Sequence, residues 1–241
     1  MELAHKETHA DKVVKVYFDP DPLNPRKEWD NGTIMVHWHS RYDLGDKRVD
    51  RCTSDELVAQ CQEEGDPILA ILPLYLYDHS GLSVSTGGFS CRFDSGQVGW
   101  VYITQSKSDE MGFPKEYTKE MYEEVIKGEV KNYDDYLTGQ VFGYVVEGRD
   151  GDELASCWGF VGDKDDCLSE GKSAAEGVTD PAIERAQRDL QFPRLLAEIK
   201  AVGLMPEQMR DLCTSMDCTP EFIHEVLDRA EEEFERLKAK L

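Results

Sequence analysis

The sequence lacks the features that direct a protein into a membrane or out of the cell. No apolar run approaches the roughly 20 residues that a membrane-spanning helix needs. The first residues, MELAHKETHADKVVKV, lack the apolar centre of a signal peptide. The sequence therefore predicts a protein without a membrane span or a secretion signal.

The cysteines lack the spacing of a disulfide framework or a zinc site. There are 7 of them, an odd number, and no two form a Cys-x-x-Cys pair. This pattern is typical of reduced thiols in a cytoplasm and disfavours tetrahedral zinc. His37 and His39 project from one side of a predicted strand, but no third ligand lies near them. We interpret them as histidines on a solvated strand face and predict no metal site.

Common catalytic signatures are also missing. The 241 residues contain no glycine-rich phosphate loop, no His-Glu-x-x-His helix and no paired-carboxylate motif. The sequence therefore predicts no cofactor, and an enzyme is not the first interpretation.

Positive charge is scarce. The chain has 27 Lys and Arg against 49 Asp and Glu, a formal net charge of −22. Such a charge keeps a protein soluble and disfavours contact with phosphate backbones and anionic membranes. We therefore predict no direct binding to DNA, RNA or membranes. The carboxylates either face a basic partner protein or form a well-solvated surface.

Residues 72–105 carry the most distinctive pattern, LPLYLYDHSGLSVSTGGFSCRFDSGQVGWVYITQ. Alternating leucines at its start and the β-branched and aromatic residues of 98–103 predict two strands. The loop between them is dense in Ser, Gly, Asp, His and Cys. Loops of this length in a compact domain are commonly functional, so we predict a long hairpin whose loop is the centre of function.

Two kinds of chemistry are open to this loop. As a catalytic site of a small cysteine-dependent hydrolase or transferase, it would use Cys91 as the nucleophile, His79 as the base and Asp94 as the orienting carboxylate. No strand-to-helix nucleophile elbow frames the cysteine, so catalysis is the alternative interpretation. As a binding surface, the loop would contribute Tyr77, Asp78, His79, Ser80, Asp94, Ser95 and Gln97.

The remaining patterns predict an α+β domain over residues 12–162, with a mainly antiparallel sheet and a few helices. Residues 1–11 are expected to be frayed. Residues 163–180 are polar, small and acidic, which predicts a linker. The expected strands are 13–18, 33–39, 140–147 and 153–161, and the expected helices are 53–62, 118–127 and 130–137, with Gly128 as a helix stop.

Residues 181–241 predict a C-terminal module of three helices, beginning at Pro181, with the rhythm of a helix-turn-helix. A helix that reads DNA needs cations and amides, whereas the last helix of this module is rich in carboxylates. We therefore predict that it docks a protein. The best local candidates for an acidic contact surface are Glu225, Asp228, Glu232 and Glu235.

Several motifs resemble a family of proteins encoded by phages and integrative mobile elements. They are NPRKEWDNGTIMVHWHSRYDLGDK, LPLYLYDHSGLSVSTGGFSCRFDSGQVGWVYIT, LTGQVFGYVVE and SCWGF, and they span about residues 13–162. Arg92 departs from the Pro or small residue that the family pattern leads us to expect. The tail resembles a helical module of phage-encoded proteins. The family supplies no established activity, and the resemblance implies an accessory gene of a mobile element acting in a bacterial cytoplasm.

Charge and resemblance together predict a non-enzymatic accessory protein that binds a basic host or phage protein. The expected partner is a nucleic-acid enzyme of a host defence system, inhibited by an acidic surface that mimics DNA. The alternatives are the cysteine-dependent enzyme and a structural or regulatory phage protein that docks a partner through its helical tail.

Overall fold

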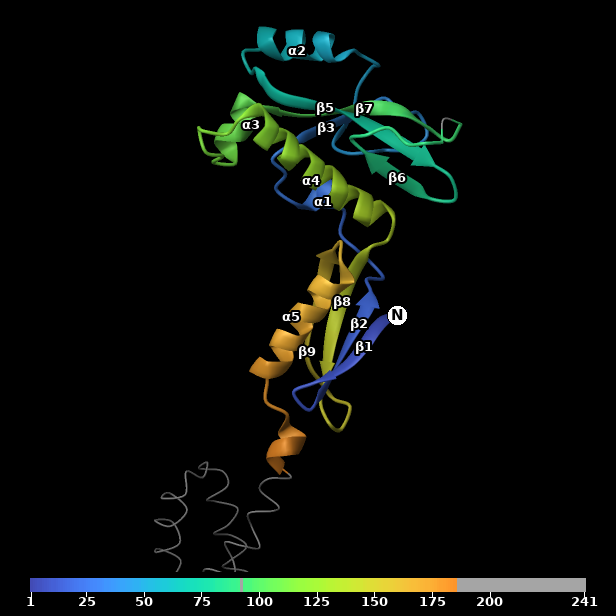
Figure 1. The fold of residues 1–241 in the computed structure, drawn as a ribbon, viewed down its shortest axis with the longest axis vertical. Helices are drawn as coiled ribbons and strands as arrows, with labels where there is room; N and C mark the ends of the chain where they lie inside the picture. The colour runs from blue at the N-terminus through green and yellow to red at the C-terminus, as the bar shows by residue number, and fades with distance from the viewer. Residues whose placement is uncertain (92, 186–241) are drawn as a thin grey trace, which may run out of the picture. The chain divides into compact units, whose positions relative to one another are not determined.

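The structure is a computed structural model that describes residues 1–91 and 93–185 (Figure 1). It divides into two units, one of residues 1–146 and 155–175 and one of residues 147–154 and 176–241. Most of the predicted C-terminal module lies outside the described residues. The described part is α+β, as predicted, and its strands form two sheets.

The larger sheet has the strand order β4-β3-β7-β5-β6, and it confirms the predicted long hairpin. Strands β5 and β7 pair antiparallel from Ile68 opposite Thr104 to Tyr77 opposite Ser95. A short strand that the sequence did not predict, β6, occupies part of the loop and pairs with the other edge of β5. The strands are β3 (Ile34–His37), β4 (Lys47–Arg48), β5 (Ile68–Asp78), β6 (Leu82–Ser85) and β7 (Ser95–Thr104).

Helix α4 (Lys119–Leu137) covers one face of this sheet (Figure 1). It buries Ile126, Val130 and Tyr133 in the main hydrophobic core. The prediction of two helices separated by a stop at Gly128 is wrong. A glycine inside a helix costs about 1 kcal/mol, and burial of the apolar residues on both sides of Gly128 offsets that cost.

Helix α2 (Ser54–Glu63) covers the opposite face and confirms its prediction. The Thr53 hydroxyl accepts the Glu56 N–H, and the Glu56 carboxylate accepts the Thr53 N–H, which is a capping box. Leu57 and Cys61 pack on the sheet beside Tyr102. Two short helices, α1 (Pro25–Glu28) and α3 (Gln105–Glu110), complete this part.

The smaller sheet has the strand order β1-β2-β8-β9. The prediction that residues 1–11 are frayed is wrong, because β1 pairs antiparallel with β2. The turn between them places Ala10 and Asp11 at φ 49° and 60°. That geometry suits a two-residue hairpin turn, but Ala-Asp lacks the glycine that signals one in a sequence. The strands are β1 (Leu3–His9), β2 (Lys12–Phe18), β8 (Val141–Glu147) and β9 (Glu153–Val161).

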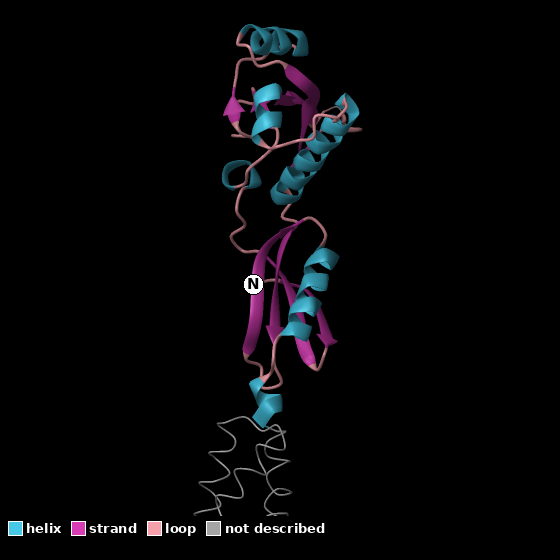
Figure 2. Ribbon diagram, turned by 90° about the vertical axis from the view of Figure 1, so that its left-hand side faces the viewer, coloured by secondary structure: helices cyan, strands magenta, loops and turns pink. Residues whose placement is uncertain are grey.

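Helix α5 (Lys164–Gly177) packs on one face of the smaller sheet (Figure 2). The prediction of a linker over residues 163–180 is therefore wrong for this segment. Its buried side is made of Cys167, Leu168, Gly171 and Ala175. Because a Cβ at Gly171 would lie 2.7 Å from Val14 Cγ1, small residues are what allow the close approach. Such a stripe is only weakly hydrophobic, so the sequence pattern did not reveal it.

The larger sheet is inserted into the chain between two neighbouring strands of the smaller one. Strand β2 ends at Phe18 and its neighbour β8 begins at Val141, and the Asp19 N–H donates to the Val141 carbonyl at 2.8 Å. The helix predicted to begin at Pro181 does so, since Asp180 Oδ1 accepts the Ala182 N–H at 2.8 Å. No helix among the described residues is long and apolar enough to cross a bilayer.

Candidate functional site

The end of the β5–β7 hairpin brings together the three side chains that the sequence proposed for catalysis. Asp94 lies at the centre, with its Oδ2 3.4 Å from Cys91 Sγ and 3.5 Å from His79 Nδ1. A nucleophile and base relay requires the imidazole between thiol and carboxylate. Here the carboxylate lies between the other two, and no hydrogen bond joins Cys91 to His79 in the described chain. The residues meet as predicted, but in a different order.

Backbone contacts explain how this loop keeps its shape. The Asp78 N–H donates to the Asp94 carbonyl at 2.8 Å, and the Ser95 hydroxyl donates to the Cys91 carbonyl. Ser80 adopts a φ of 55°, the left-handed region, at the tip that links β5 to β6. These serine and aspartate residues are therefore engaged in holding the loop.

Asp78 is the centre of a second polar group on the same end of the sheet. Its carboxylate accepts hydrogen bonds from Arg41 Nη2 at 2.8 Å and from the Tyr42 hydroxyl at 3.3 Å. The rings of Tyr42 and His39 stack with their centroids 5.0 Å apart. Partial burial lowers the pKa of His39. Arg41 and Tyr42 were not among the binding residues that the sequence predicted.

A hollow of about 340 Å³ lies between these two polar groups. His39, Arg41, Asp78 and Asp94 line it, so it presents charges of both signs. Phe93 stands at its edge and is 100% exposed. A fully exposed aromatic ring beside charged groups is the composition of a protein contact rather than of a closed catalytic pocket.

The predicted binding residues are distributed over two places. Tyr77 stacks on His79 and on Phe89, with ring centroids 6.0 and 5.5 Å apart, at the same end of the sheet. Gln97 lies elsewhere, in a hollow beside Trp38 and Trp100. The predicted acidic surface at Glu225, Asp228, Glu232 and Glu235 lies outside the described residues.

The interpretation of His37 as a residue on a solvated strand face is wrong. The side chain is 1% exposed, because both faces of β3 are covered. Nε2 accepts the Leu44 N–H at 3.3 Å and lies 3.5 Å from Asp43 Oδ1, while Nδ1 has no hydrogen-bond partner. Burial lowers the pKa of His37. A neutral imidazole therefore fills this position as part of the core.

A buried arginine forms a further polar cluster that the sequence did not reveal. The Arg26 guanidinium bonds Asp46, Glu129 at 2.8 Å and the Thr33 carbonyl at 2.9 Å. Glu129 also accepts the Gly32 N–H at 2.6 Å. Because its partners come from different parts of the chain, this cluster fixes loops around α4.

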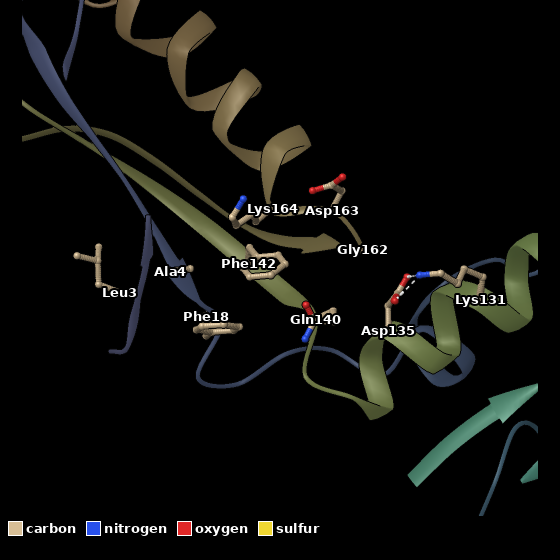
Figure 3. A pocket seen from close by; sticks show the side chains of 10 residues that line it. All are labelled: Leu3, Ala4, Phe18, Lys131, Asp135, Gln140, Phe142, Gly162, Asp163 and Lys164. Atoms are coloured by element: carbon tan, nitrogen blue, oxygen red, sulfur yellow. Dashed lines mark hydrogen bonds and ion pairs between the residues drawn. The ribbon is translucent and has the colours of Figure 1, made fainter. Parts of the chain in front are cut away.

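A second hollow, of about 710 Å³, lies beside the smaller sheet (Figure 3). Phe18 and Phe142 form an aromatic wall, with ring centroids 5.1 Å apart. Lys131 and Asp135 line another part of it and are paired with each other (Figure 3). Because Lys131 and Asp135 pair with each other, they have less charge to offer a ligand. This hollow is therefore a weaker candidate for a functional site than the hairpin end.

No group of three or more His, Cys, Asp or Glu among the described residues could hold a metal ion. Comparison with protein-family models, with curated proteins and with solved structures gave no match. The resemblance to mobile-element proteins and the helical docking module therefore stay predictions.

Proposed function

We propose that the protein acts by binding a basic partner protein through its carboxylates. The observation that carries this proposal is the net charge of −22, most of which belongs to residues 1–185. A partner with a nucleic-acid channel fits this chemistry, because carboxylates can take the places of phosphates and release counterions. In this proposal the protein is an acidic inhibitor encoded by a mobile element, directed at a nucleic-acid enzyme of host defence.

Helix α5 supplies an acidic surface for such contact among the described residues. Asp165, Asp166 and Glu170 are exposed on its first half. Lys164 Nζ pairs with Asp165 at 2.7 Å and neutralises part of this charge. The two aspartates lie in the first helical turn, where negative charge also stabilises the helix dipole. We call these three residues the α5 acidic group.

Capture of partners from a host lysate at low and high salt tests the proposal. A nucleic-acid enzyme should be retained at about 50 mM salt and released at about 500 mM, because screening shortens the range of charge attraction. Neutralising the α5 acidic group with Asn and Gln should weaken that retention. Absence of any salt-sensitive partner, or full retention by the neutralised protein, would contradict the proposal.

A matched control separates a specific surface from total charge. Asp55 and Glu63 on helix α2 and Glu64 at its C-cap are three exposed carboxylates. Replacing them with Asn and Gln removes the same charge from another part of the molecule. Equal weakening by both triple variants would show that binding depends on overall charge and not on the α5 acidic group.

A cysteine-dependent activity is a second candidate, favoured by the approach of Cys91 and His79 to Asp94. Catalysis here requires the imidazole to turn from the carboxylate toward the thiol. Alkylation of the protein with iodoacetamide, followed by peptide mapping, would compare Cys91 with the exposed Cys157. Faster alkylation of Cys91 that is lost in His79→Ala would support the activity, and equal rates would count against it.

A further inference from the structure

Two tryptophans line one hollow on the α2 face of the larger sheet, outside the polar groups of the hairpin end. Trp100 lies on β7 directly opposite Val36 of β3. Trp38 follows Val36 by two residues, just past the end of β3. Both indoles line a hollow of about 510 Å³. That volume lies in the range of small-molecule sites, roughly 300–1,000 Å³.

Contacts within the chain hold the hollow in shape, and both tryptophans stay only half-buried. The Trp100 indole N–H donates to the Cys52 carbonyl at 3.1 Å, which fixes the orientation of that ring. The Arg51 guanidinium lies over the Trp38 ring, 5.9 Å from its centroid. Gln97 donates to the Gly99 carbonyl at 3.2 Å and retains its amide oxygen as an acceptor.

The polar lining offers both donors and acceptors. Arg51 and the Gln97 amide donate, the Ser54 hydroxyl does both, and the Glu56 carboxylate accepts, while the Thr53 hydroxyl is already engaged with Glu56. Glu56 uses Oε2 for both of its hydrogen bonds to Thr53, and a carboxylate has a second oxygen for a ligand. A phosphate would need donors alone and would meet this carboxylate, so the lining does not suit an anion.

From this geometry we infer that the hollow is a binding site for a neutral saccharide of one or two rings. The weakly positive C–H groups of a sugar ring pack on the negative faces of indole rings. Its hydroxyls need donors and acceptors in alternation, as Arg51, Gln97 and Glu56 provide. The net charge of −22 also favours a neutral ligand over an anionic one. This site is independent of the proposed protein partner.

The test uses the full chain labelled with 5-fluorotryptophan and followed by ¹⁹F NMR. The chain contains 4 tryptophans, so each resonance can be assigned by a Trp→Phe variant. Glucose, galactose, N-acetylglucosamine, mannose, maltose and AMP are titrated separately. We expect at least one neutral sugar to shift the Trp38 and Trp100 resonances saturably, with a Kd at or below about 10 mM, while Trp29 and Trp158 stay unmoved.

Variants then locate the site. Trp100→Ala and Gln97→Ala should each weaken sugar binding at least about tenfold, the larger loss coming from the indole. Gln97→Ala leaves both indoles in place, so it answers the question even where Trp100→Ala does not fold. Trp158→Ala, on the smaller sheet, is the matched control and should bind as the unchanged protein does. Absence of saturable shifts, shifts by AMP alone, or equal binding by Gln97→Ala would overturn the inference.

Discussion

The Arg26 side chain is 1% exposed and lies between the carboxylates of Asp46 and Glu129. Removing one member of a buried charge group leaves the others uncompensated, which costs about 3–5 kcal/mol. We therefore expect Arg26→Ala to lower the free energy of unfolding by at least about 3 kcal/mol in urea titrations.

An arginine on the surface provides the comparison for this prediction. Arg41 pairs with Asp78 at 2.8 Å, but its side chain is 70% exposed. Exposed pairs contribute about 0–1 kcal/mol, so Arg41→Ala should change stability little. A similar loss in both variants would mean that the buried cluster adds nothing beyond an ordinary surface pair.

His37 gives the protein a dependence on pH in mildly acidic solution. Burial lowers its pKa below the ordinary value of 6.5, and Asp43 opposes this only in part, while Arg48 and His39 add to it. In mildly acid solution His37 therefore binds a proton more strongly in the unfolded chain than in the folded protein. Stability should therefore be complete above about pH 7 and fall as the pH drops through about 6.5.

A variant without a titrating ring tests this dependence. His37→Gln keeps an acceptor for the Leu44 N–H, so the hydrogen bond at 3.3 Å can persist. Urea unfolding at about pH 8 and about pH 5.5 should show a smaller loss of stability in the variant than in the unchanged protein. His39 should account for part of the loss of stability that remains in the variant, because burial also lowers the pKa of His39. An identical loss in both proteins would count against the role of His37.

At the scale of elements, helix α4 gives two glycines opposite roles. Gly128 lies inside the helix, and a Cβ there would meet nothing within 4 Å. Gly139 follows the helix end with a φ of +75°, where L residues are strained. Gly128→Ala should stabilise the protein by about 0.5–1 kcal/mol, and Gly139→Ala should destabilise it by about 1 kcal/mol.

Thermal unfolding of the two variants checks this contrast under one set of conditions. The midpoint should rise for Gly128→Ala and fall for Gly139→Ala. A fall for both would mean that the helix is broken at Gly128, as the sequence alone suggested.

The elements that the sequence predicted are those with local signals. Thr53 or Ser54 as a cap, followed by two acidic residues, marked the start of α2, and the Gly-Arg-Asp-Gly-Asp turn marked the hairpin of β8 and β9. The elements that it missed depend on partners far along the chain. Helix α5 has a stripe of small residues that becomes meaningful only against Val14.

Distance along the chain also explains which candidate site could be predicted from the sequence and which could not. Cys91 and Asp94 are neighbours in the sequence, and the hairpin returns the chain to His79, so their meeting was predictable. The tryptophan hollow was not, because it depends on the register that sets Val36 opposite Trp100. Alternation places a side chain on a face of a strand, but it does not fix which residue of a distant strand lies beside it.

At the scale of the whole molecule, the net charge of −22 creates self-repulsion in the folded state. Salt screens this repulsion, with a Debye length that shrinks from about 10 Å at 0.1 M to about 3 Å at 1 M. We expect the thermal midpoint to rise between about 0.05 and 0.5 M NaCl. Scanning calorimetry measures it, and a midpoint that falls with salt would show that ion pairs outweigh the repulsion.

The insertion of the larger sheet between β2 and β8 has a consequence for synthesis on the ribosome. The β1–β2 hairpin emerges well before its neighbour β8, which begins only at Val141. An isolated hairpin is marginally stable in water, and closing a long loop carries an entropic cost. The inserted sheet and α4 should therefore fold before the smaller sheet closes. Until then, the open edge of β2 is the point at which a nascent chain is most exposed to chaperones and to aggregation.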